Sequence, residues 1–156
     1  MKQHRYKIRN TWTGNIGLGT YDYKSYERAY TISVEGKPDL SGSSDPSFRG
    51  DRSRHNPEEL FLASIASCHM LWFLHLCSVE GVVVSAYEDV ATGTMVEKKD
   101  GSGRFTEVIL KPVVTVSSAE MIPKAETLHA RANEMCFIAN SCNFPIRHQP
   151  QTQIVF

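Results

Sequence analysis

The stretch from Asn56 to Gly81, NPEELFLASIASCHMLWFLHLCSVEG, constrains the fold more than any other part of the sequence. Asn56 can cap a helix, Pro57 suits the first helical position, and the side chain of Glu59 can reach back to the capping amide. Gly81 is a helix stop signal. The interval of about 24 residues between these signals predicts one helix of roughly 36 Å.

Apolar side chains point in every direction around this predicted helix, so it must be covered on all sides. They are Leu60, Phe61, Leu62, Ile65, Met70, Leu71, Trp72, Phe73, Leu74, Leu76 and Val79. A membrane span is the alternative, because about 20 such residues cross a bilayer. Polar residues interrupt the run, however, and no basic flank supports insertion. We therefore expect no membrane association, but a core helix wrapped by this chain, alone or with a second copy.

Composition predicts a single soluble domain over residues 1–156, since 41% hydrophobic and 22% charged residues are ordinary globular usage. The 17 basic and 17 acidic residues cancel, which excludes a basic stripe for nucleic acid and favours a small-molecule partner. The N-terminal segment MKQHRYKIRNTW carries no secretory signal, so we expect a cytoplasmic protein. In that reducing compartment we expect the four cysteines to be free thiols, metal ligands or redox residues rather than structural disulfides.

The segments before the long helix predict strands. Residues 4–14 alternate between apolar and polar side chains, and the glycines that follow indicate a hairpin leading to a strand at residues 28–35. Residues 36–54 are rich in Gly, Ser, Pro and Asp, which predicts a long polar loop.

The segments after the long helix predict a hairpin, a helix and a strand. Residues 82–97 and 104–117 form the expected hairpin, in which Pro112 indicates an edge strand or a bulge. A helix is predicted from Pro123 to about Cys136, and a short strand over residues 152–156. The order of elements predicts one α+β domain.

Cys68 and Cys77 cannot bond to each other. Nine residues apart on one helix, they lie about 180° around it and about 13.5 Å along it, whereas a disulfide needs α-carbons within about 7 Å. A partner for Cys68 must therefore be Cys136 or Cys142. The alternative for any one buried helical cysteine is simple apolar packing, which is our expectation for Cys77.

The string NPEELFLASIASCHM, followed by an apolar helix, a hairpin and a second helix ending ANEMCFIANS, resembles the OsmC/Ohr family of thiol-dependent hydroperoxide reductases. The resemblance implies that Cys68 attacks the peroxide and that Cys136 resolves the resulting sulfenic acid as a disulfide. It also implies antiparallel sheets wrapped around long central helices in an intertwined homodimer. No bound cofactor is implied, and the disulfide is reduced by an external dithiol, of the lipoyl type in this family.

The resemblance further implies an arginine that holds the thiolate and a glutamate that orients this arginine. Glu58 matches the glutamate, and helical geometry places it about 80° around from Cys68. The first hairpin, TGNIGLGT, contains no arginine, so the role passes to Arg28. A fixed cation is needed because only the thiolate attacks, and a free thiol has a pKa of about 8.5. The competing candidates are Arg49, Arg52 and Arg54.

The apolar residues Phe61, Met70 and Trp72 favour an organic hydroperoxide over hydrogen peroxide as the substrate. A second hypothesis is a non-enzymatic binder of apolar or thiol-bearing ligands on the same fold. The missing hairpin arginine and Phe137, which follows the second cysteine, both allow it. Peroxide-dependent loss of a reduced dithiol separates the two hypotheses.

A zinc site is the remaining alternative, and we expect no metal. The available ligands include His69, His75, Cys77 and Cys142 beside Cys68, but the sequence contains no C-x-x-C pair. Adjacent helical residues such as Cys68 and His69 also diverge by about 100°. The two histidines are expected to be core residues.

Overall fold

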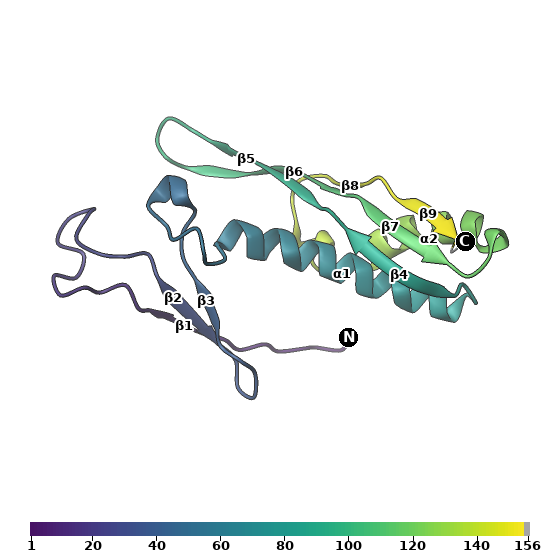
Figure 1. Ribbon diagram of the computed structural model, residues 1–156, viewed down its shortest axis with the longest axis horizontal. Coiled ribbons are helices and arrows are strands. Elements are labelled where there is room, and N and C mark those ends of the chain that lie inside the picture. Colours follow the sequence, from purple (N-terminus) through teal and green to yellow (C-terminus); the bar gives the residue numbers. More distant parts are fainter. Residues whose placement is uncertain (155–156) are drawn as a thin grey trace. The chain divides into compact units, whose positions relative to one another are not determined.

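The computed structural model of the protein describes residues 1–154, and Figure 1 shows the order of its helices and strands. The chain forms two compact units, Met1–Leu60 and Phe61–Phe156, which are described here one at a time. The expectation of a single domain over residues 1–156 stays a prediction.

The first unit contains a three-stranded antiparallel sheet in the order β1-β2-β3. Its strands are β1 (Arg9–Trp12), β2 (Tyr30–Ser33) and β3 (Leu40–Gly42). Both predicted strands are therefore confirmed, in shorter form. The predicted loop over residues 36–54 is wrong in part, because it contains β3 and a 3-10 turn at Pro46–Phe48. A three-residue strand is too short to show an alternating pattern.

The predicted hairpin between β1 and β2 is confirmed, with a long connection. The amide of Thr13 donates to the carbonyl of Ala29 at 2.9 Å, and that of Glu27 donates to the carbonyl of Gly14 at 2.9 Å. Gly14 is required by close approach, since a Cβ there would collide with the carbonyl of Glu27. The Trp12 indole also donates to this carbonyl, at 2.9 Å.

The long helix α1 (Pro57–Val79) begins and ends where the sequence predicts. The Asn56 side chain accepts a hydrogen bond from the amide of Glu59 at 2.8 Å, and the Glu59 carboxylate accepts one from the amide of Asn56 at 3.3 Å. This reciprocal pair is a capping box. Beyond the helix, Gly81 adopts a φ of 74°, which favours glycine and ends the helix.

The second unit contains two mixed three-stranded sheets, β4-β7-β9 and β5-β6-β8. The predicted hairpin is confirmed, since β4 pairs with β7 and β5 with β6, both antiparallel. The C-terminal strands β9 and β8 add to β7 and β6 in parallel. The strand bounds are β4 (Val84–Asp89), β5 (Thr92–Glu97), β6 (Gly103–Leu110), β7 (Pro112–Val116), β8 (Ile146–His148) and β9 (Gln151–Ile154). Residues 155–156 of the predicted closing strand lie outside the described residues.

The expectation of an edge strand or a bulge at Pro112 is wrong. Pro112 is the first residue of β7, the middle strand of its sheet, and the register shift of that sheet lies in β4, between Val84 and Ala86. A proline is tolerated at the first residue of a strand because its missing amide falls outside the ladder. The preceding amide, of Lys111, donates to the Asp89 carboxylate at 2.7 Å instead.

Helix α2 (Ile122–Met135) confirms the second predicted helix, and its buried face joins α1 in one of two apolar clusters. This first cluster comprises Phe73, Leu76, Cys77, Val82, Val114, Val116, Ala125, Leu128 and Ala132. The second cluster has Ile65, Val108 and Leu110 at its centre.

Within the second unit α1 is not buried on all sides. The buried stripe of the helix consists of Ile65, His69, Phe73, Leu76 and Cys77. Leu71 and Val79 remain 62% and 67% exposed, because the sheets of this unit and α2 cover only one side of the helix. By length and composition alone α1 could also cross a membrane. The buried stripe is instead what a core helix presents.

Candidate functional site

The structure brings Cys68 and Cys136 together. Cys68 is half-buried on α1, and Cys136 is fully buried at the C-terminal cap of α2; both are free thiols. The pKa of Cys136 is raised to about 11, first by burial and then by the neighbouring Cys68 side chain. The two thiols are therefore neighbours, and among the four cysteines they are the pair best placed to form a disulfide.

The end of α2 explains the position of Cys136. The buried residues Leu128 and Ala132 lie eight and four positions before it, so Cys136 continues the face that α2 buries. The chain then leaves the helix, and Cys136 adopts an extended conformation with φ −70° and ψ 110°. The amide of Ala139 points back and donates to the Cys136 sulfur at 3.4 Å. This donor favours a negative charge on the sulfur.

The other two cysteines have different surroundings. The thiol of Cys142 donates to the carbonyl of Ile138 at 3.3 Å, and burial raises its pKa. Cys77 lies in the apolar cluster with Phe73 and Leu76, and burial raises its pKa to about 11. The expectation that Cys77 is a packing residue is confirmed.

An aromatic surface lies one helical turn beyond Cys68. Trp72 makes edge contacts with His75 and Phe137, each at 5.7 Å between ring centroids. Leu71, Trp72 and His75 line a shallow pocket of about 270 Å³. The contact of Trp72 with Phe137, which is 68% exposed and directly follows Cys136, is not evident from the sequence. We call Leu71, Trp72, His75 and Phe137 the aromatic surface.

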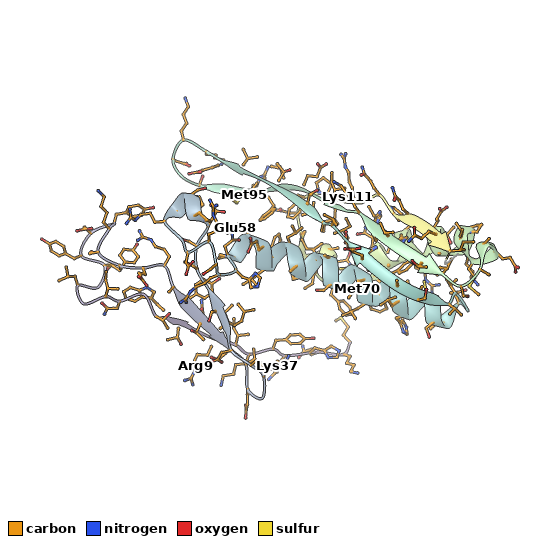
Figure 2. All side chains as sticks on the ribbon, in the orientation of Figure 1. Arg9, Lys37, Glu58, Met70, Met95 and Lys111 are labelled. Carbon is orange, nitrogen blue, oxygen red and sulfur yellow. The ribbon has the colours of Figure 1, made fainter. Side chains whose placement is uncertain are left out.

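The other two predicted substrate residues lie in different places. Phe61 packs against Phe105 and Phe144, at 5.0 and 6.1 Å between centroids. It precedes Cys68 by two turns, on the same side of α1 and about 10 Å away along the axis. Met70 follows Cys68 by two residues and therefore lies about 200° around the helix; Figure 2 labels it in the middle part of α1. The structure does not bring Met70 to the Cys68 side, and its substrate role stays a prediction.

Glu58 lies in the first turn of α1, where Figure 2 labels it. Its oxygen Oε2 is buried and accepts no hydrogen bond from any described residue. The pKa of Tyr30 is raised, first by burial and then by the nearby Glu58 carboxylate. A buried carboxylate oxygen without a donor costs free energy, so this position suits an additional hydrogen-bond donor.

Arg28 is held rigidly within the first unit. Its guanidinium donates to the backbone carbonyls of Tyr26 and Tyr23, both at 2.6 Å, and lies over their rings at 4.1 and 4.4 Å. In the part of the chain that the structure describes it forms no ion pair. Its role toward Cys68 stays a prediction.

Arg28 also lines a pocket of about 400 Å³ in the first unit, together with the competing candidates Arg49 and Arg54. Arg54 is paired with Asp51 at 3.2 Å. Arg49 lies 5.8 Å from the centre of the Tyr23 ring, so this ring contacts two guanidinium groups.

Three buried or half-buried histidines, His69, His129 and His148, form a cluster that no pattern in the sequence predicts. His69 Nε2 lies 3.1 Å from His129 Nδ1, and the two rings are parallel within 9°. The ring of His148 lies 5.3 Å from that of His69. The pKa of His69 is lowered to about 4, first by burial and then by His148. The pKa of His129 is lowered to about 3, first by burial and then by His69 and His148. Within residues 1–154, no group of three or more His, Cys, Asp or Glu residues is arranged to hold a metal ion.

Comparisons with known proteins agree with this fold. A family model described as OsmC-like protein matches residues 50–150. The structure is similar to that of an OsmC-like protein of unknown function from Vibrio cholerae, with 29% identity and a TM-score of 0.86 over 96% of this chain and 100% of the other. No curated protein matches the sequence.

Two organic hydroperoxide resistance proteins share the fold. The protein from Elizabethkingia anophelis is 17% identical, with a TM-score of 0.68 over 99% of this chain and 100% of the other. The protein from Legionella pneumophila is 18% identical, with a TM-score of 0.67 over 98% and 100%. At these identities the likeness concerns the α+β fold alone. The match of the family model over residues 50–150, together with this fold, establishes that the chain belongs to the OsmC-like protein family.

Proposed function

We propose that the protein is a thiol-dependent peroxidase that reduces organic hydroperoxides to alcohols. The observation that carries the proposal is the contact between two free thiols, Cys68 on α1 and Cys136 at the end of α2. Membership of the OsmC-like family, whose fold is shared by organic hydroperoxide resistance proteins, supports it.

Cys68 is the attacking residue in this reaction. Its thiolate attacks the distal oxygen of the hydroperoxide, an S–O bond forms, the O–O bond breaks, and the alkoxide takes up a proton and leaves as the alcohol. Cys136 then attacks the sulfenic sulfur of Cys68. An S–S bond forms, the S–O bond breaks, and water leaves. An external dithiol reduces the disulfide and becomes a disulfide itself.

The surroundings of the two thiols support this division of roles. Burial holds Cys136 as a neutral thiol at pH 7, because its pKa is raised to about 11. Cys136 is therefore a poor competitor for peroxide, and the half-buried Cys68 is the accessible sulfur. The Ala139 amide, at 3.4 Å from the Cys136 sulfur, supports the charge that develops there when it attacks.

The aromatic surface favours a hydroperoxide with an apolar body. Trp72 follows Cys68 by four residues, and Phe137 directly follows Cys136. The two aromatic rings contact each other, with 5.7 Å between their centroids. An alkyl or aryl group buried against these rings gains about 25 cal/mol per Å² of apolar area. Hydrogen peroxide gains nothing from them.

Arg28 and Glu58 are the proposed brace of the Cys68 thiolate. Arg28 carries a charge that no described carboxylate compensates, and Glu58 Oε2 lacks a donor among the described residues. Arg28 can donate hydrogen bonds to Glu58, and the Glu58 carboxylate can compensate the charge of Arg28, because a guanidinium and a carboxylate form a strong charged pair. This brace completes the site in the active protein.

The active protein is a cytoplasmic homodimer in this proposal. A second copy covers the side of α1 that Leu71 and Val79 leave exposed by 62% and 67%. Exposed apolar area of this kind on a helix marks an interaction surface. The reducing compartment supplies the dithiol that regenerates the two thiols.

The proposal is tested with a dihydrolipoamide-coupled assay that compares cumene hydroperoxide with hydrogen peroxide. We expect turnover with the organic peroxide and little with hydrogen peroxide. Cys68→Ser should abolish turnover, whereas Cys77→Ser, the matched control on the same helix, should retain it. Absence of turnover with both peroxides would refute the proposal.

A non-enzymatic binder of apolar or thiol-bearing ligands is the second candidate. It is supported by Arg28, whose guanidinium already donates to two backbone carbonyls. A binder leaves the dithiol unconsumed in the same assay, while an apolar ligand quenches the fluorescence of Trp72 beside the pocket of about 270 Å³.

A further inference from the structure

A buried contact between two histidines joins the helices that carry the two cysteines. His69 on α1 directly follows Cys68, and His129 on α2 precedes Cys136 by two helical turns, on the same side of α2. His69 Nε2 and His129 Nδ1 are 3.1 Å apart. We propose that His69 and His129 are positioning residues, which set the placement of α2 on α1 so that the two thiols meet. This inference rests on the proposed function.

The contact between His69 and His129 is directional because it is a hydrogen bond. A hydrogen bond between two imidazoles needs one ring nitrogen with a proton and one without, so the two rings cannot both be protonated. Burial favours the neutral form of both rings, since His69 is 1% exposed and His129 2% exposed. Apolar side chains at these positions would also hold the helices together, but they would allow sliding. A single donor and a single acceptor at 3.1 Å allow one placement.

The ring of His129 contacts two side chains of α1. One face stacks on Phe73 at 3.9 Å between centroids with 10° between planes, and one edge meets the edge of the His69 ring, with 5.4 Å between centroids and 9° between planes. Phe73 and His69 lie one turn apart on α1, so the His129 ring sits against two successive turns of that helix. His148 of β8 contacts the outer part of the cluster at 5.3 Å from His69.

The histidine cluster lowers the stability of the folded protein. The nitrogens His69 Nδ1, His129 Nε2 and His148 Nε2 are buried and have no hydrogen-bond partner among the described residues. Each buried polar atom without a partner destabilises the folded state relative to a well-packed apolar side chain. A core built for stability would use leucine or phenylalanine here, so a positional role accounts better for the imidazoles.

The position of α2 matters because disulfide formation tolerates little error. The two sulfurs must approach to about 2.0 Å, with α-carbons about 5.5–6 Å apart. His129 lies about 10.5 Å from Cys136 along the α2 axis, so a shift of α2 at His129 is transmitted through two rigid turns. Such a shift separates the thiols.

The test measures the effective concentration of the two thiols, from the equilibrium of the Cys68–Cys136 disulfide with reduced and oxidised glutathione. Two variants of His129 separate the hydrogen bond from the stacking. His129→Phe keeps a ring on Phe73 and removes Nδ1, whereas His129→Asn keeps a polar atom near the Nδ1 position and removes the ring. We expect the effective concentration to fall about tenfold in His129→Phe, the size of one net hydrogen bond. In His129→Asn it should stay close to the wild-type value.

Leu128→Ala is the matched control, because it removes a buried side chain from the same helix without touching the histidine contact. It should lower the melting temperature and leave the effective concentration close to the wild-type value. If Leu128→Ala lowers it as much as His129→Phe, or if His129→Phe leaves it unchanged, the positioning role is refuted.

A second pair of variants probes the contact from α1. His69→Gln keeps a polar atom near the Nε2 position and should behave as the wild type, whereas His69→Leu should show the tenfold loss. This pair decides the question if His129→Phe does not fold. The glutathione equilibrium needs no peroxide, so it separates the two proposals: a protein without peroxidase turnover can still show the histidine effect, and an active enzyme can lack it.

Discussion

Acidification should destabilise the protein through its buried histidines. In the folded state burial lowers the pKa of His69 to about 4 and that of His129 to about 3, whereas an unfolded histidine titrates near 6.5. The unfolded state therefore binds more protons than the folded state below pH 6.5. Stability is complete above this pH and is lost as the pH falls toward 4. His148, whose pKa burial also lowers, acts in the same direction.

The loss of stability at a given pH follows from the difference between that pH and the pKa of an unfolded histidine. At pH 5, which is about 1.5 units below 6.5, each buried histidine lowers the free energy of unfolding by about 2 kcal/mol, since one pKa unit corresponds to about 1.36 kcal/mol. His69 and His129 together give about 4 kcal/mol. A domain of this kind has a total stability of about 5–15 kcal/mol, so the loss is readily measured.

The assay is urea unfolding followed by circular dichroism between pH 7.5 and pH 5, at one fixed protein concentration. The control is the double variant His69→Gln, His129→Asn, which keeps polar atoms at both positions and removes both titrations. Carboxylates contribute equally to both proteins. The double variant should lose about 4 kcal/mol less than the wild type over this range. Equal losses in both proteins would refute the assignment of these two histidines as neutral in the folded state.

Four further predictions concern the site and the fold. Cys136→Ser should consume about one peroxide per active site and then stall with a sulfenic acid on Cys68, detected by mass spectrometry after dimedone labelling; repeated turnover would contradict the resolving role. If Arg28 braces the Cys68 thiolate as proposed, Arg28→Ala should slow the alkylation of Cys68 by iodoacetamide at pH 7 several-fold. If a second copy covers the exposed side of α1 as proposed, Leu71→Asp places a charge in that interface and should shift sedimentation from dimer to monomer. Asn56→Ala should lower the free energy of unfolding by about 1 kcal/mol in urea titrations, because the helix loses its cap.

Local signals in the sequence predict the long helix well. Both hydrogen bonds of the capping box exist, at 2.8 and 3.3 Å between Asn56 and Glu59. A cap depends on residues within one turn of each other, so it can be recognised without knowledge of the fold. Pro112 shows the limit of such signals, because the number of neighbours of a strand is a property of the whole sheet.

The sequence does not determine which residues from distant parts of the chain come into contact. Helical spacing excluded Cys77 as a partner of Cys68 but left both Cys136 and Cys142, and only the fold brings Cys136 into contact. The histidine contact joins residues 60 positions apart, and nothing near either residue indicates it. The short strand β3 was missed because three residues carry no periodic pattern.

The order of the strands has a consequence for synthesis of the protein. The inner strands β6 and β7 receive their second neighbours, β8 and β9, only after the whole of α2 has been made. Until then both strands present one unpaired edge each, and such edges recruit other chains. A nascent chain that has emerged through α2 but not through residues 146–154 is therefore prone to aggregation, and slow translation of this interval would prolong the exposure of the two edges.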